Sequence, residues 1–145
     1  MPKTIVHSCS SSLVRPNGIV RYINSVIELQ KSWGHRVIFV TDAKPTEHIV
    51  ADEIVYVNEV STYFPYNPTR EKKDGDLPDL HINHAVVTQI RNAFKKLDVE
   101  PNLVIVHDLH SYMAADFDDG IFVQHESDVL YPGRRDSYMS DEWIA

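Results

Sequence analysis

The sequence predicts an α/β fold with a doubly wound parallel sheet. Short apolar, β-branched runs alternate along the chain with longer stretches that have helical spacing. Residues 37–40 are apolar throughout, which is typical of a strand buried on both faces of a parallel sheet. The segments between the strand-like runs are long enough for the crossovers that parallel pairing requires.

The first half of the chain contributes three strands and one helix to this prediction. A strand is predicted over residues 3–7, followed by a serine-rich loop over residues 8–12. Asn17 and Gly18 mark the turn into a helix that ends near Gly34, where glycine is the expected stop. The helix itself is predicted because Ile19, Ile23, Val26, Ile27 and Gln30 recur at spacings of three and four. Two further strands are predicted over residues 37–41 and 53–57.

The second half is predicted to begin with a long surface loop over residues 58–80, which is rich in proline and charge. The remaining predicted elements are a helix over residues 83–97, a strand over 103–107, a short helix over 111–115 and a strand over 121–124. At 145 residues the chain is expected to form one domain.

Composition excludes several classes of protein. Fourteen Lys and Arg against 21 Asp and Glu give a net charge of −7, which argues against a mainly electrostatic binder of nucleic acid or membranes. Cys9 is the single cysteine, so no internal disulfide forms and a reducing compartment is expected. No apolar run approaches the roughly 18 residues of a membrane span, and the N-terminus lacks a signal-peptide pattern. We therefore expect a cytoplasmic protein.

Histidines follow three of the predicted strands. His7, His107 and His125 close strands whose carboxyl ends would meet at one edge of a parallel sheet, and Asp108 and His110 follow close behind His107. Ligands of open α/β sheets bind at this edge, so we interpret these residues as a binding site. The alternative is that they are polar caps bonded to nearby backbone.

Three further features are candidates for the same site. Asn17 and Gly18 precede a helix whose free N–H groups can bind phosphate, although one glycine falls short of the dinucleotide fingerprint and a plain turn is the alternative. Arg134 can pair with phosphate, or can be a solvated surface residue. Glu126 beside His125 can act as a general base, or can simply face solvent.

A metal site is not predicted. His107, Asp108, His110 and His125 are suitable ligand types, but neither cysteine pairs nor a His-Glu-x-x-His helix accompany them.

Several segments together resemble retaining GT-B glycosyltransferases of the family-4 type. The matching segments are residues 17–22 (NGIVRY), 33–41 (WGHRVIFVT), 103–110 (LVIVHDLH) and 122–126 (FVQHE). The last of these, with the Arg134-Arg135 pair that follows, is also similar to the DNA α-glucosyltransferases of T-even phages.

The resemblance implies an N-terminal, acceptor-side Rossmann-like domain, one half of a GT-B architecture, with the donor-binding domain absent from this chain. It implies a nucleotide-sugar donor as co-substrate, no other cofactor, and an acceptor that is a glycan, a lipid or a modified base of phage DNA. His125 and Glu126 would be catalytic, although the family usually has Asp where Glu126 stands. The resemblance places Asn17 and Gly18 near the donor phosphates, and Asn17 replaces the first glycine of the family's pair.

We assign six residues to substrate or donor binding: Asn17, Gly18, His107, Asp108, His110 and Arg134. Two other functions remain open: a non-catalytic nucleotide- or protein-binding module with the same fold, and a metal-dependent hydrolase that uses the histidines.

Overall fold

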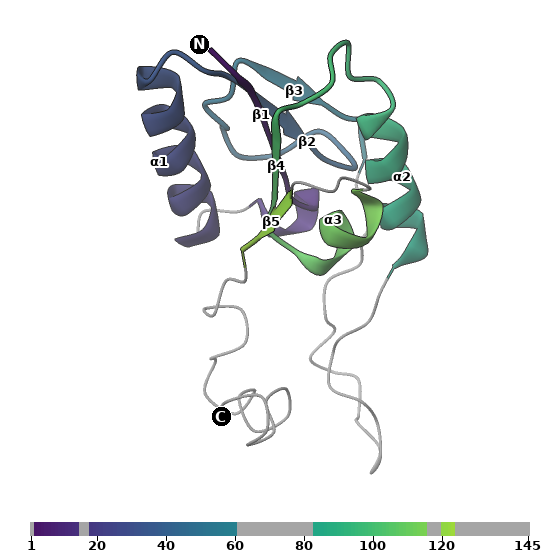
Figure 1. Ribbon diagram of the computed structural model, residues 1–145. Coiled ribbons are helices and arrows are strands. Elements are labelled where there is room, and N and C mark those ends of the chain that lie inside the picture. Colours follow the sequence, from purple (N-terminus) through teal and green to yellow (C-terminus); the bar gives the residue numbers. More distant parts are fainter. Residues whose placement is uncertain (1, 15–17, 61–82, 116–119, 124–145) are drawn as a thin grey trace, which may run out of the picture.

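The computed structural model describes residues 2–14, 18–60, 83–115 and 120–123. Five parallel strands form one sheet in the order β3-β2-β1-β4-β5 (Figure 1). The strands are β1 (Thr4–Ser8), β2 (Arg36–Val40), β3 (Glu53–Val55), β4 (Leu103–Val106) and β5 (Gly120–Phe122). This order confirms the predicted α/β class and the parallel, Rossmann-like sheet.

Helices cover both faces of the sheet (Figure 1). Helix α1 (Gly18–Ser32) lies on one face, where its buried side chains pack with Ile5 of β1 and Phe39 of β2. Helices α2 (His84–Phe94) and α3 (Leu109–Ala114) lie on the other face, where Val6 and Val106 contribute to a second apolar cluster. Because side chains alternate between the faces of a strand, each inner strand supplies both clusters.

The helices begin and end where the sequence places suitable residues. Asn83 caps α2, because its side chain accepts a hydrogen bond from the backbone N–H of Ala85 at 3.0 Å. Asp108 caps α3 in the same way through Ser111. After α1 the chain turns at Gly34, whose φ of +88° is strained for any residue with a Cβ atom.

The element boundaries differ from the predicted ones by a few residues. The largest difference is at α2, which ends at Phe94 rather than near residue 97. One element was not predicted: a short 3₁₀ helix, η1 (Ser11–Leu13), follows β1 where we expected a loop. Of the predicted loop over residues 58–80, only residues 58–60 are described, and the rest lies outside the described residues.

The strand order reverses direction between β1 and β4. Chain segments run outward from β1 through β2 to β3, then return to the other side of β1 for β4 and β5. Such a reversal opens a crevice at the carboxyl ends of the two central strands. No described helix is both long enough and apolar enough to cross a membrane.

Candidate functional site

Two of the predicted histidines meet at the carboxyl ends of β1 and β4. His7 lies in β1 and His107 directly follows β4. His7 Nδ1 and His107 Nε2 are 2.8 Å apart, and the two rings stack with their centroids 5.1 Å apart. Both side chains are buried. The reversal of strand order thus brings together residues that are 100 positions apart in the sequence.

Gln30 of α1 fixes the positions of the protons in this pair. Gln30 Oε1 lies 2.7 Å from His7 Nε2, and a carboxamide oxygen only accepts hydrogen bonds, so His7 Nε2 carries a proton. In a neutral His7 ring the Nδ1 atom is then an acceptor, and His107 Nε2 donates to it. The three side chains form an ordered chain that orients the His107 ring.

The surroundings of His7 favour its neutral form. Burial lowers the pKa of His7 below its ordinary value of 6.5, and the hydrogen bond to Gln30 offsets this only in part. An imidazole that is held in one orientation, as His107 is, is suited to hydrogen bonding with a hydroxyl group.

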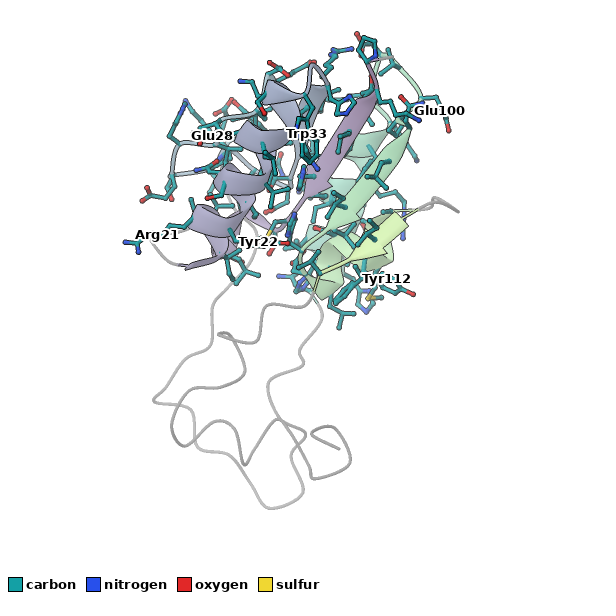
Figure 2. The ribbon with its side chains drawn as sticks, turned by 60° about the vertical axis from the view of Figure 1, so that its left-hand side comes forward. Arg21, Tyr22, Glu28, Trp33, Glu100 and Tyr112 are labelled. Carbon is teal, nitrogen blue, oxygen red and sulfur yellow. The ribbon has the colours of Figure 1, made fainter. Side chains whose placement is uncertain are left out.

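Tyr22 lies in the second turn of α1 (Figure 2) and borders His107. The two rings meet edge to face, with their centroids 6.1 Å apart and their planes at 71°. Gly18, one turn before Tyr22, is exposed, and a Cβ atom added there would meet nothing within 4 Å. The open space around Gly18 leaves room for a ligand to approach the backbone at the start of α1.

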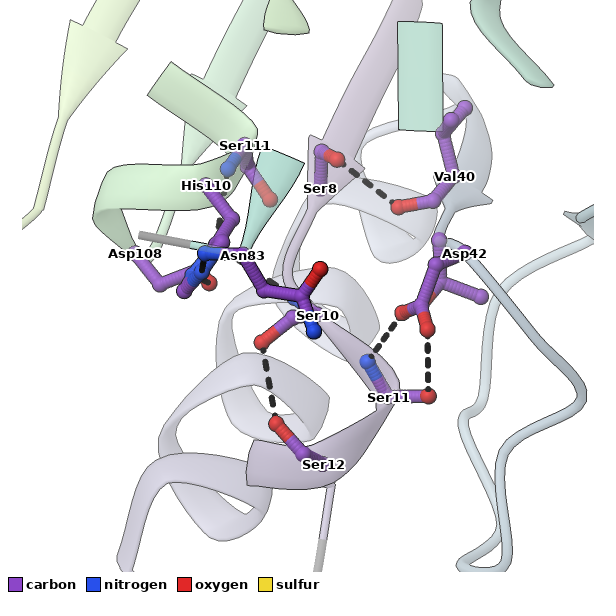
Figure 3. Close-up of polar contacts among 11 residues, drawn as sticks. Ser8, Ser10, Ser11, Ser12, Val40, Asp42, Asn83, Asp108, His110 and Ser111 are labelled. Carbon is purple, nitrogen blue, oxygen red and sulfur yellow. Dashed lines mark hydrogen bonds and ion pairs between the residues drawn. The ribbon is translucent and has the colours of Figure 1, made fainter. Parts of the chain in front are cut away.

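Two carboxylates hold the loop that follows β1 (Figure 3). Asp42 accepts hydrogen bonds from the backbone N–H of Ser11 at 2.7 Å and from its hydroxyl at 3.1 Å. Asp108 accepts one from the backbone N–H of Ser10 at 3.3 Å. Both carboxylates are buried. Because these two N–H groups are already used, the loop is not an open cradle for a phosphate.

Asp108 and His110 have structural partners as well. Asp108 Oδ2 lies 3.4 Å from His110 Nδ1, and His110 Nε2 accepts a hydrogen bond from the backbone N–H of Asn83 at 3.1 Å. Burial favours a raised pKa of Asp108, but the hydrogen bonds from His110, Ser111 and Ser10 outweigh it and leave that pKa below 3.8. The two residues tie the starts of α2 and α3 together, which matches the capping alternative of the sequence analysis.

Sequence reasoning missed Asp42, Gln30 and Tyr22 as members of this edge. A signal existed for Asp42, which directly follows the predicted strand over residues 37–41. A signal also existed for Gln30, a polar residue within the apolar stripe of a helix, where a buried carboxamide needs a partner. Tyr22 carried no comparable signal.

Four of the predicted site residues lie outside the described residues: Asn17, His125, Glu126 and Arg134. The catalytic pair and the phosphate-binding arginine therefore stay predictions. Within the described ranges, no group of three or more His, Cys, Asp or Glu side chains is placed to hold a metal ion.

A small apolar surface lies beside this edge, on α3 and β5. Leu109, Tyr112 and Met113 share one face of α3 by their spacing, and each side chain is at least 40% exposed. The Tyr112 ring contacts Phe122 of the edge strand β5, with the centroids 5.3 Å apart. We call these four residues the α3–β5 apolar surface.

Comparisons with known proteins do not extend this description. No protein-family model, curated protein or solved structure matches the chain.

Proposed function

We propose that this chain is the acceptor-side domain of a glycosyltransferase that moves a sugar from a nucleotide-sugar donor to an acceptor. The observation that carries the proposal is the buried, oriented His7–His107 pair, whose His107 ring meets Tyr22 of α1. It lies where the strand order reverses, which is where open α/β sheets bind their ligands. The resemblance of residues 17–22, 103–110 and 122–126 to GT-B enzymes supports the same assignment.

In this proposal the described edge supplies two kinds of contact. Gly18, at the start of α1, and Asn17, which precedes it in the sequence, lie near the donor phosphates or sugar. His107, held in one orientation by His7, offers a hydrogen-bonding ring to a sugar hydroxyl. Asp108 and His110 act indirectly, by fixing the loop after β1 and the starts of two helices.

The reacting groups in this proposal come from the segment after β5. His125 and Glu126 carry the acid–base and electrostatic roles at the sugar, and Arg134 pairs with donor phosphate. A further, donor-binding domain completes the site. The acceptor is a glycan, a lipid or a modified base of DNA, and the net charge of −7 favours the first two. A cytoplasmic location fits the single cysteine and the use of nucleotide sugars.

The test is an assay of sugar transfer by the protein that contains this chain, with labelled UDP- and GDP-sugars and release of nucleotide as the readout. His125→Ala is expected to lower turnover by about 10²- to 10⁴-fold, which is the range for loss of an acid–base group. His48→Ala is the matched control, because His48 is an exposed histidine in the connection between β2 and β3. Equal turnover by the two variants would show that His125 has no part in the mechanism. If the unchanged protein turns over none of the donors, the proposed activity is wrong.

A protein-binding module is the second candidate, and the α3–β5 apolar surface favours it. Exposed aromatic and methionine side chains in contact with one another are typical of protein interfaces. Two results together would favour this function over the enzyme. The chain would not bind nucleotide sugars, and it would bind a partner protein that the Tyr112→Ala variant no longer binds.

A further inference from the structure

A polar groove lies between the end of β3 and the first turns of α2, on the face of the sheet opposite α1. Its volume is about 540 Å³, within the roughly 300–1,000 Å³ typical of small-molecule sites. The residues that line it are Val57, Asn58, His84, Ala85, Thr88, Gln89 and Asn92. The His7–His107 pair is not part of this lining.

The hydrogen-bonding state of the carboxamides distinguishes this groove from the rest of the described surface. Four described Asn and Gln side chains hold protein partners: Asn24, Gln30, Asn83 and Asn102. The other three carboxamides of the described ranges are Asn58, Gln89 and Asn92, and none of them makes a side-chain hydrogen bond. All three line the groove, so hydrogen-bonding capacity not used by the fold is concentrated there.

The lining has no charged partner for a ligand. Among the seven lining residues there is no Lys, Arg, Asp or Glu, and His84 is the one titratable side chain. A phosphate would lack the cation that normally binds it. A nucleobase would lack the aromatic or broad apolar faces between which bases stack, because only Val57 and Ala85 are apolar.

We propose that this groove binds a neutral sugar unit. A sugar hydroxyl donates and accepts hydrogen bonds at once, and carboxamides match it because they offer both an acceptor oxygen and donor hydrogens. Gln89 and Asn92 are one turn apart on α2, and Asn58 faces them from the end of β3. Together with Thr88 they present a set of uncharged donors and acceptors around one cavity.

This inference goes beyond the proposed function and does not depend on it. The groove would bind a sugar whether or not the protein transfers one, and the transfer assay measures nucleotide release rather than binding to the groove. The failure of either proposal is therefore visible without reference to the other.

The test is an NMR titration of the full 145-residue chain with the methyl glycosides of glucose, mannose and galactose. We expect at least one of these sugars to shift the side-chain amide signals of Asn58, Gln89 and Asn92. Gln89→Ala and Asn92→Ala should each weaken that binding about 5- to 10-fold, the equivalent of one lost hydrogen bond. Both changes place alanine in a helix, where it is the most favourable residue, so the fold is retained.

Glu28→Ala, an exposed change on α1, is the matched control and should bind the sugar as the unchanged chain does. Uridine and inorganic phosphate are the other arms of the titration, and neither should shift the three amides. The proposal is overturned if no glycoside shifts these signals, if both variants bind as tightly as the control, or if phosphate or uridine takes the groove instead.

Discussion

The surroundings of His7 make stability depend on pH. His7 is buried, where a charged ring is costly, and its two ring nitrogens are hydrogen-bonded to Gln30 and to His107. The fold therefore stabilises the neutral form of His7, whose pKa burial lowers below 6.5. In the unfolded chain the same ring titrates at its ordinary value.

Stability should fall as the pH drops through 6.5. Below that pH the unfolded chain binds a proton that the folded His7 rejects, so the free energy of unfolding decreases toward the folded pKa. Urea unfolding between about pH 7 and pH 5 measures this loss, and His7→Gln should make it shallower because glutamine does not titrate.

His48→Gln, the same substitution at an exposed histidine, is the control for that experiment. An NMR titration of the His7 ring in the unchanged chain checks the same point without a variant. A His7 pKa at or above 6.5 would contradict the prediction.

At the scale of elements, the loop after β1 owes its shape to side chains from other strands. Its short helix, η1, is three residues long, and such a turn has little stability of its own. Asp42 after β2 and Asp108 after β4 supply the missing stability through the backbone of Ser11 and Ser10. The loop is thus part of the packed edge of the sheet.

Removal of one of these carboxylates should be costly. Asp42→Ala leaves the buried N–H and hydroxyl of Ser11 without their acceptor, so we expect a loss of about 1–3 kcal/mol in the free energy of unfolding. Asp98→Ala removes an exposed partner of Arg36 and should cost less than about 1 kcal/mol. Equal urea midpoints for the two variants would contradict the assigned role of Asp42.

The sequence predicted the regular elements of the fold but not the loop after β1. The strands and longer helices follow from apolar periodicity, because buried faces must repeat with the period of the element. The η1 helix could not be predicted in this way, since its serines carry no periodicity and their partners come from other strands. Local pattern predicts elements, and it does not predict what distant carboxylates do to a loop.

The candidate site was also predictable only in part. The positions of His7 and His107 after neighbouring strands predicted a shared edge. Their direct contact, the part played by Gln30 and the structural role of Asp108 depend on side-chain direction, which sequence spacing leaves open. The groove beside α2 carried no motif at all, because its residues are ordinary surface types that only the fold brings together.

At the scale of the whole molecule, β1 depends on two neighbours that are made at different times. It pairs with β2 on one side and with β4 on the other, and β4 also completes both apolar clusters. Without β4, Val6 and Ile5 lose a large part of their packing, so the remaining strands should not form a stable sheet.

A chain cut at residue 98, before β4, should therefore be unfolded. The lost burial of the β4 side chains amounts to several kcal/mol, which is comparable with the total stability of a domain of this size. Circular dichroism and urea titration of the truncated and intact chains measure the difference. A cooperative unfolding transition in the truncated chain would contradict this prediction.

The central place of β1 has a further consequence during synthesis. Until residues 103–106 have left the ribosome, the strand that ends up in the middle of the sheet is an edge strand, with unpaired backbone groups along one side. The nascent chain must keep that apolar edge from pairing with other chains while about a hundred residues are translated. Co-translational chaperones should therefore bind the nascent chain during this interval and release it once β4 has emerged.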